Sequence, residues 1–171
     1  MKIQAYNTIK IPVEFELKEK KSIFLAKAFQ VSNEGNVDSI LNDLKKKYYD
    51  AAHRCYAYRL LSGKSKFSDA GEPSGTAGIR ILNAIDHYQL QNCLVVVIRY
   101  FGGTKLGVGP LGKAYYTSAI NALAKGEIIL RKPYNKVQLQ ADIATLDKIT
   151  SFLLSNKIKI TKTDPQNFEM E

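Results

Sequence analysis

The stretch Leu94–Leu123 reads LVVVIRYFGGTKLGVGPLGKAYYTSAINAL and carries the strongest structural pattern in the chain. It opens with a short, β-branched apolar run, Leu94–Ile98, which is typical of a strand buried on both faces. Five glycines follow between residues 102 and 112, and Pro110 stands where a first helical residue is expected. Ala114–Leu123 then continues as a helix. The pattern predicts a strand, a glycine-rich loop and a helix N-terminus whose free backbone N–H groups form a natural anion site.

The chain is strongly basic, with 25 Lys and Arg against 16 Asp and Glu and a net charge of +9. This balance favours a polyanionic partner such as RNA, DNA or a ribosome, although a lysine-rich background composition would give the same balance. The distribution helps to decide, because residues 87–126 hold no carboxylate while Arg99, Lys105, Lys113 and Lys125 fall among them. The positive charge is therefore concentrated on the glycine-rich segment.

Length and composition indicate a soluble protein that folds without cross-links. The 171 residues suffice for one full domain, or one domain with a small appendage. Cys55 and Cys93 lie in apolar, strand-like runs and are interpreted as buried free thiols, because a secreted disulfide framework would use more cysteines. The chain shows no signal-peptide core and no apolar run near the ~18 residues of a membrane span. We expect a cytoplasmic protein without membrane association.

Two nucleotide-binding patterns match the glycine-rich loop, but the context of each is wrong. Gly107–Gly112 fits G-x-G-x-x-G, yet residues 102–106 separate it from the strand that the glycines of a dinucleotide-binding fold follow directly. The same loop fits G-x-x-x-x-G-K, but Ala114 stands where a P-loop needs Ser or Thr to hold Mg²⁺. His53 and Cys55 are too few for a structural zinc site. We therefore expect no cofactor and no metal.

Residues 53–61 predict a strand with two unlike faces, one small and apolar, the other basic and aromatic. The second face is formed by Arg54, Tyr56 and Tyr58. Basic side chains interleaved with aromatics can hold phosphates and stack bases. The alternative is that the tyrosines pack under a neighbouring helix.

The remaining pattern supplies further elements. Residues 13–31 predict a hairpin with its turn at 19–21, and residues 33–36 a loop before an amphipathic helix over 37–48. Residues 62–78 form a second loop rich in Ser, Gly and Lys, followed by a helix over about 76–88 with Ser74 or Thr76 as its N-cap. A short strand is expected over 127–130. We expect the two loops to face each other across a groove.

Three motifs resemble the YigZ/IMPACT family: AAHRCYAY at residues 51–58, DAGEPSGTAG at 69–78 and VIRYFGGTKLG at 97–107. The resemblance implies an α+β fold over residues 1–132, with a β-sheet that carries two helices on one face. That domain is similar to the second domain of a small-subunit ribosomal protein and to domain IV of elongation factor G. Bacterial members add a ferredoxin-like domain, of which residues 133–171 supply about half, as a partial β-α-β unit.

The family resemblance implies a role linked to translation, since eukaryotic relatives regulate translation by competing for the activator of the amino-acid-starvation kinase. We expect a non-catalytic protein that binds nucleic acid, RNA above all, or the ribosome. A protein–protein regulatory module is the alternative, and a hydrolase would require Glu72, Ser74 and His53 to meet in a deep cleft. Oligomeric state stays open. The expected anion- or nucleic-acid-binding residues are Arg54, Tyr56, Tyr58, Lys64, Lys66, Ser74, Thr76, Arg80, Arg99, Tyr100, Gly102, Gly103, Lys105, Gly107 and Lys113.

Overall fold

The fold is built around β6 (Cys93–Tyr100), the strand that the apolar run predicts. The computed structural model describes residues 5–133, 142–156 and 158, and separates the chain into the units Met1–Pro133 and Tyr134–Glu171. In the first unit β6 is the central strand of a five-stranded antiparallel sheet with the order β2-β3-β6-β4-β5. Its other strands are β2 (Val13–Glu19), β3 (Ser22–Gln30), β4 (His53–Arg59) and β5 (Ser65–Ser68).

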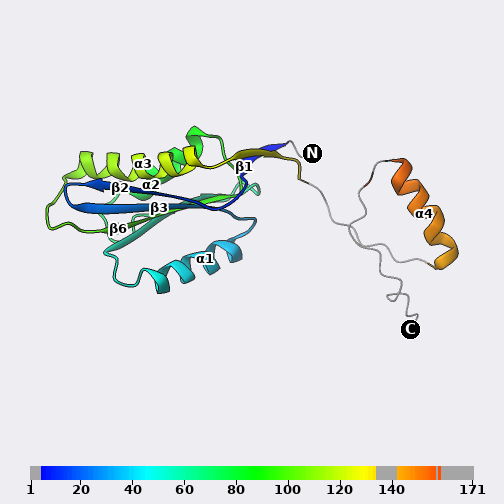
Figure 1. Ribbon diagram of the computed structural model, residues 1–171, viewed down its shortest axis with the longest axis horizontal. Coiled ribbons are helices and arrows are strands. Elements are labelled where there is room, and N and C mark those ends of the chain that lie inside the picture. Colours follow the sequence, from blue (N-terminus) through cyan, green and yellow to red (C-terminus); the bar gives the residue numbers. More distant parts are fainter. Residues whose placement is uncertain (1–4, 134–141, 157, 159–171) are drawn as a thin grey trace. The chain divides into compact units, whose positions relative to one another are not determined.

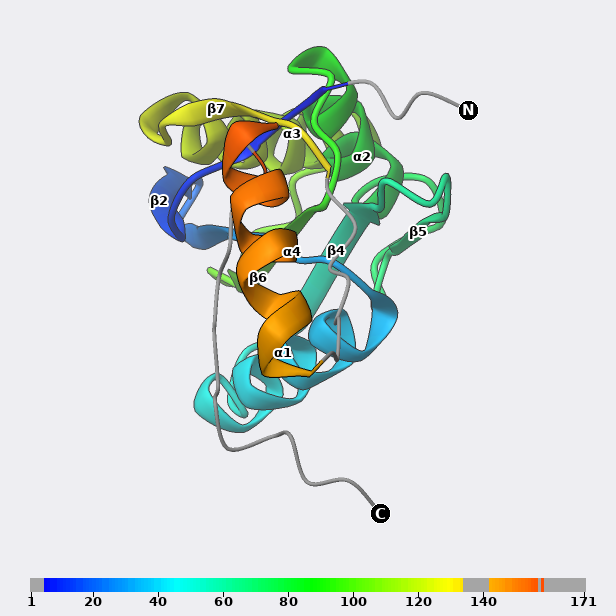
Figure 2. The ribbon, with the colours of Figure 1, turned by 90° about the vertical axis from the view of Figure 1, so that its right-hand side faces the viewer.

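Helices cover both faces of this sheet. Figures 1 and 2 show α2 (Gly78–His87) and α3 (Val108–Lys125) on one face and α1 (Glu34–Lys47) on the other. The expected pair of helices on one face is therefore present, and the predicted α+β class is confirmed. Residues of β6 alternate between the two cores: Val95 and Val97 pack under α2 and α3, and Val96 packs toward α1. Burial on both faces explains the unbroken apolar run.

The β2–β3 hairpin turns at Lys20 and Lys21, as predicted. Both residues have positive φ, 44° and 67°, which is the backbone of a tight two-residue hairpin turn. Lysines stand at both turn positions, where Gly or Asn is more usual. The turn therefore exposes two lysine side chains at the end of the sheet.

Several boundaries differ from the prediction. Helix α1 begins at Glu34, because the Asn33 side chain caps it by accepting the N–H of Asn36, so residues 33–36 are not a loop. Helix α3 begins at Val108, which makes Pro110 its third residue; proline is tolerated there because N–H groups of the first turn have no intrahelical partner.

Two short strands were absent from the prediction. One is β5, and the other is β1 (Tyr6–Ile9), which pairs antiparallel with β7 (Ile128–Arg131) at the predicted 127–130 strand.

The second unit contributes α4 (Ile143–Ser155), close to the helix predicted over 144–155. Asp142 caps it by accepting the N–H of Thr145 at 2.8 Å. The strand predicted over 136–141 lies outside the described residues, as does all of the 158–163 strand except Ile158. None of the described helices is long and apolar enough to cross a membrane.

Candidate nucleic-acid interface

A carboxylate from the chain itself closes the N-terminus of α2. Asp69, just after β5, accepts hydrogen bonds from the backbone N–H groups of Gly75, Ala77 and Gly78 at 2.9, 2.9 and 2.8 Å. Burial raises the pKa of Asp69, but these three bonds outweigh it and hold the pKa below its usual value. An anionic ligand at this helix end would have to displace Asp69.

The two predicted N-cap residues do not cap α2. The N-cap position is held by Ala77, without a side-chain bond. Thr76 is buried and donates its hydroxyl to the Pro73 carbonyl at 2.6 Å. Ser74 is exposed in the loop before the helix. The N-cap prediction is therefore wrong, and the Thr76 hydroxyl is already engaged inside the protein.

Arg99 lies inside the domain with only 4% of its surface exposed. Its Nη1 donates to Oε1 of Glu72 at 2.6 Å, and its Nη2 donates to Oγ of Ser22 at 3.4 Å. The guanidinium lies 5.2 Å from the ring centroid of Phe24 and 5.5 Å from that of Phe101. The expectation that Arg99 contacts a phosphate is corrected here, because Glu72 neutralises its charge away from solvent.

Glu72 joins the 69–78 loop to three other elements. Besides the ion pair with β6, its Oε1 accepts the hydroxyl of Tyr115 on α3 at 2.7 Å. Its Oε2 lies 3.8 Å from Nε2 of His53 on β4. Burial raises the pKa of Tyr115, so its hydroxyl stays protonated and serves as a donor. The cluster fixes the loop against the sheet.

Cys55 completes this cluster as an unreactive thiol. Its Sγ donates to the Asp69 carbonyl at 2.9 Å, and burial raises its pKa to about 12. Both cysteines are buried and free, as predicted. Of the three residues that a hydrolase would need, Glu72 and His53 meet, but within the described part of the chain no hydrogen bond joins Ser74 to either of them.

The basic and aromatic face of β4 lies toward α1, on the side of the sheet opposite α2 and α3. Tyr58 is 4% exposed and donates its hydroxyl to Glu34 of α1 at 3.0 Å. Tyr56 and Tyr100 are partly buried in the same cluster, and Arg54 donates to a backbone carbonyl at 2.7 Å. These residues therefore follow the alternative interpretation, in which the tyrosines pack under a neighbouring helix. Because Tyr58 is buried, it cannot stack a base.

Lys64 and Lys66 also belong to the α1 side. The Lys64 Nζ lies 2.6 Å from Oε2 of Glu34. Lys66 stands opposite Tyr58 in the β4–β5 register, and opposite residues share a face. Neither lysine lies on the face of the sheet that α2 and α3 cover.

The glycines of the 102–107 loop shape the backbone. A Cβ on Gly102 would come within 2.0 Å of the carbonyl carbon of Lys21, so only glycine lets the loop lie against the hairpin turn. Gly103 and Gly107 have φ of +84° and +82°. Through this contact the loop lies against the end of the sheet that carries Lys21, and Lys105 of the same loop is exposed.

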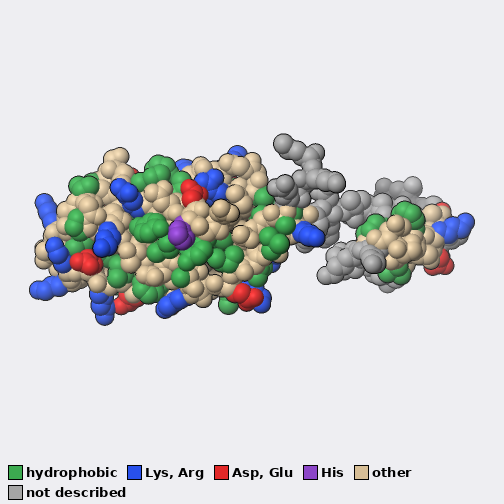
Figure 3. Space-filling view, turned by 90° about the horizontal axis from the view of Figure 1, so that it is seen from above, with side chains coloured by type: hydrophobic (Ala, Val, Ile, Leu, Met, Phe, Trp, Pro, Cys, Tyr) green, Lys and Arg blue, Asp and Glu red, His purple; other side chains and the backbone are tan. Residues whose placement is uncertain are grey.

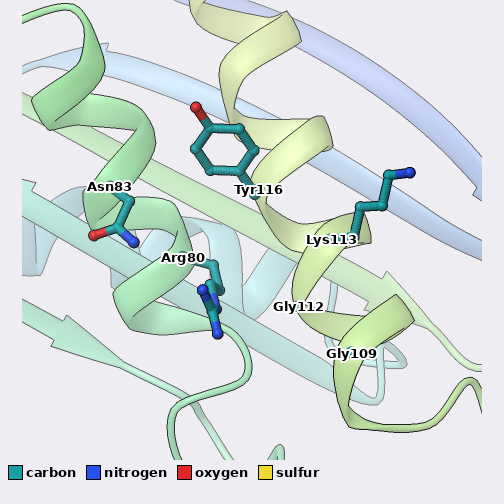
Figure 4. A pocket seen from close by; sticks show the side chains of 6 residues that line it. All are labelled: Arg80, Asn83, Gly109, Gly112, Lys113 and Tyr116. Carbon is teal, nitrogen blue, oxygen red and sulfur yellow. The ribbon is translucent and has the colours of Figure 1, made fainter.

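A groove with a volume of about 370 Å³ runs between α2 and α3. Figure 4 shows its side chains, which come from both helices. Its lining consists of Arg80, Asn83, Gly109, Gly112, Lys113 and Tyr116. A Cβ on Gly112 would come within 3.3 Å of Nε of Arg80, so this glycine leaves room for the guanidinium. Among the predicted basic residues, Arg80 and Lys113 both line the groove.

A second hollow of about 380 Å³ lies on the other side of the α3 N-terminus. It shares Gly109 and Lys113 with the groove and reaches Glu19 beside the hairpin turn. Glycine at the N-cap and no acidic residue in the first turn leave the start of α3 without the carboxylate that closes α2. Figure 3, which looks onto the α2 and α3 side, shows basic side chains gathered toward one end of this domain.

Comparison with known proteins gives the family. A model of the Impact N-terminal domain matches residues 20–123. The IMPACT family member YvyE of Bacillus subtilis is 33% identical across 99% of this chain and 79% of its own. The chain belongs to the IMPACT family. The family member YigZ of Escherichia coli is 30% identical across 92% of this chain, and the IMPACT homolog of Dictyostelium discoideum is 40% identical across 52%.

The IMPACT fold is also recognisable among solved structures. A crystal structure described as that of a hypothetical protein has a TM-score of 0.77 and 28% identity over 94% of this chain and 80% of its own. The match with the IMPACT domain contains the sheet from β3 onward, both groove helices and the whole buried cluster. The surface between α2 and α3 is therefore part of the family domain.

Two groove residues and the role of two turn lysines of this IMPACT domain are not predicted from the sequence. Asn83 and Tyr116 line the groove but sit within helical periodicity, where nothing in the pattern marks the outward face as a site. Lys20 and Lys21 were predicted only as a turn. The close approach of the Lys21 backbone to Gly102 depends on a packing that no local pattern reveals.

Proposed function

We propose that this IMPACT family member is a non-catalytic RNA- or ribosome-binding protein that acts in the regulation of translation. The family resemblance supports the link to translation. The observation that supports the binding is the groove between α2 and α3, which is lined by Arg80, by Lys113 and by the first turn of α3, whose N-cap makes no side-chain hydrogen bond. The segment from His87 to Gly126, which includes α3, holds no carboxylate.

The strength of such binding comes from several phosphates together. One helix N-terminus contributes only ~0.3–1 kcal/mol toward an anion. Lys105 and the turn lysines Lys20 and Lys21 extend the basic surface beyond the groove, so a nucleic-acid backbone can contact several cations at once. Binding of this kind releases counterions and weakens as salt rises. The logarithm of the binding constant falls against the logarithm of the salt concentration with a slope of about −0.7 to −0.9 per neutralised phosphate.

Two observations support a non-catalytic role. Burial raises the pKa of the Cys55 thiol to about 12, so the thiol stays protonated at neutral pH and is a poor nucleophile. Glu72, the acidic residue nearest His53, is engaged by Arg99 and Tyr115 in a buried cluster. These interactions give Glu72 a structural role.

A salt titration of binding to structured RNA and to ribosomal subunits tests the proposal. The variant replaces Arg80 and Lys113 with Glu, and the matched control replaces Lys45 and Lys46 with Glu on the exposed side of α1, with the same change in net charge. We expect the groove variant to lose most of its affinity and to reduce the salt slope by about 1–2, since two phosphate contacts are removed. The control variant should retain most of the affinity.

Equal losses in the two variants would show that only net charge matters and would overturn the groove as the site. Absence of RNA and ribosome binding at low salt would overturn the proposed function itself. Capture of a nuclease-resistant protein partner that Arg80→Glu and Lys113→Glu release would instead support the alternative, a protein–protein regulatory module.

A further inference from the structure

We propose that the groove between α2 and α3 holds one unpaired nucleotide of a single-stranded RNA, with its phosphate on Arg80 and its base on Tyr116. This inference rests on the proposed function and names the form of the nucleic acid. The groove volume of about 370 Å³ falls at the lower end of the ~300–1,000 Å³ of small-molecule sites. It suits one nucleotide and not a helix of RNA.

The phosphate position follows from Arg80. Its side chain is exposed on α2, and Gly112 of α3 leaves the space that the guanidinium occupies. Within the described residues no carboxylate lies within ion-pair distance of Arg80, whereas Arg59 is paired with Asp86 and Arg99 with Glu72. A guanidinium with five donors in a planar fork matches a phosphate group.

The base position follows from Tyr116 and Asn83. Figure 4 shows the Tyr116 ring reaching from α3 toward α2, with Asn83 across from it. The ring is partly buried against the core, which fixes it, and its remaining surface borders the groove. Asn83 lies one turn after Arg80 on the same side of α2, and its carboxamide offers both a donor and an acceptor to a base edge. Aromatic side chains stack bases regardless of sequence.

The direction of the strand follows from Lys113. It borders both the groove and the second hollow, and Figure 4 shows its side chain extending away from Arg80. An RNA strand that leaves the groove over α3 places its next phosphate near the ammonium group of Lys113. A base in a duplex is already stacked on both sides, so Tyr116 can reach only an unpaired one.

The test measures binding of the full chain, by fluorescence anisotropy, to three labelled RNAs: a short single strand, the same strand with abasic sites, and a blunt duplex of the same sequence. The variant is Tyr116→Leu, and Tyr116→Phe is the control that keeps the ring. We expect Tyr116→Leu to weaken binding of the single strand by roughly 10- to 100-fold without changing the salt slope. Tyr116→Phe should bind within about twofold of the parent chain.

The abasic strand should lose affinity by a similar factor and show no further loss with Tyr116→Leu, because the two changes remove one contact. Asn83→Ala, at an exposed position that does not threaten folding, should also weaken the single strand and leave the duplex unchanged. Unchanged single-strand affinity in Tyr116→Leu, or a duplex bound as tightly as the single strand, would overturn the inference. If Arg80→Glu still weakens both RNAs in that case, the proposed function stands without it.

Discussion

At the scale of single residues, the Asp69 carboxylate accepts the free N–H groups at the N-terminus of α2, so removing it should lower the stability of the protein. We expect Asp69→Ala to lower the free energy of unfolding by about 1–2 kcal/mol, as loss of a helix cap does. The pKa of Asp69 is held below that of the unfolded chain, about 3.9, so its stabilisation is complete above that value and is lost as pH falls through the lower folded pKa. Urea unfolding from pH 7 to pH 3 measures this. Asp69→Asn should show a weaker loss at acid pH, whereas Asp38→Asn, at an exposed position of α1, should keep the parent profile.

The buried ion pair of Arg99 and Glu72 gives a second prediction at this scale. Arg99→Met leaves Glu72 buried without its cation and should cost ~3–5 kcal/mol of unfolding free energy, measured by urea denaturation. The exposed pair of Lys10 and Glu127 is the control, and Lys10→Met should cost less than about 1 kcal/mol. Similar costs for both pairs would contradict the structural role of Arg99. The sequence could not reveal this role, because the partner stands 27 residues away and only the fold decides which cations at strand ends turn inward.

At the scale of elements, Gly102 in the loop and Gly109 at the start of α3 have different structural roles. Gly102→Ala would drive its Cβ into the backbone of Lys21, and we expect a loss of ~1–3 kcal/mol in unfolding free energy. Gly109→Ala, in the first turn of α3, meets no atom outside its chain neighbours, but the Pro110 ring disfavours a helical residue with a Cβ before it. These effects oppose the gain in helix propensity, so we expect a change of less than about 1 kcal/mol. Thermal unfolding of both variants separates the two cases. A neutral Gly102→Ala would show that the hairpin and the loop do not pack as closely as described.

The same loop shows how far the sequence predicts elements and where it stops. Periodicity predicts β6, α3 and the β2–β3 hairpin, because burial on two faces or on one stripe imposes a period on the residues. It misses β5, which lies in a segment rich in Ser, Gly and Lys, and β1, which is defined by pairing with β7 across the chain. Periodicity also cannot decide which outward residues of α2 and α3 form a groove, since helix packing sets that.

At the scale of the whole molecule, the net positive charge and both hydrophobic cores belong to the first unit, residues 1–133. Residues 1–133 hold 20 of the 25 Lys and Arg and 11 of the 16 Asp and Glu, so the full net charge of +9 falls on them. Both hydrophobic cores also consist of residues from this unit. The composition predicts a basic chain, but which of its cations, Arg80 and Lys113, line the groove between α2 and α3 depends on the fold.

From this division we expect a chain ended after Pro133 to fold and bind RNA by itself. Its two cores are complete, so it should unfold cooperatively, with far-ultraviolet circular dichroism typical of an α+β domain. Because residues 134–171 hold five basic and five acidic side chains, their removal leaves the net charge unchanged, and RNA affinity at a given salt concentration should stay within a few-fold of the full chain. A non-cooperative transition would contradict the independence of the first unit. A well-folded fragment that has lost RNA binding would place the interface in residues 134–171 and away from the groove.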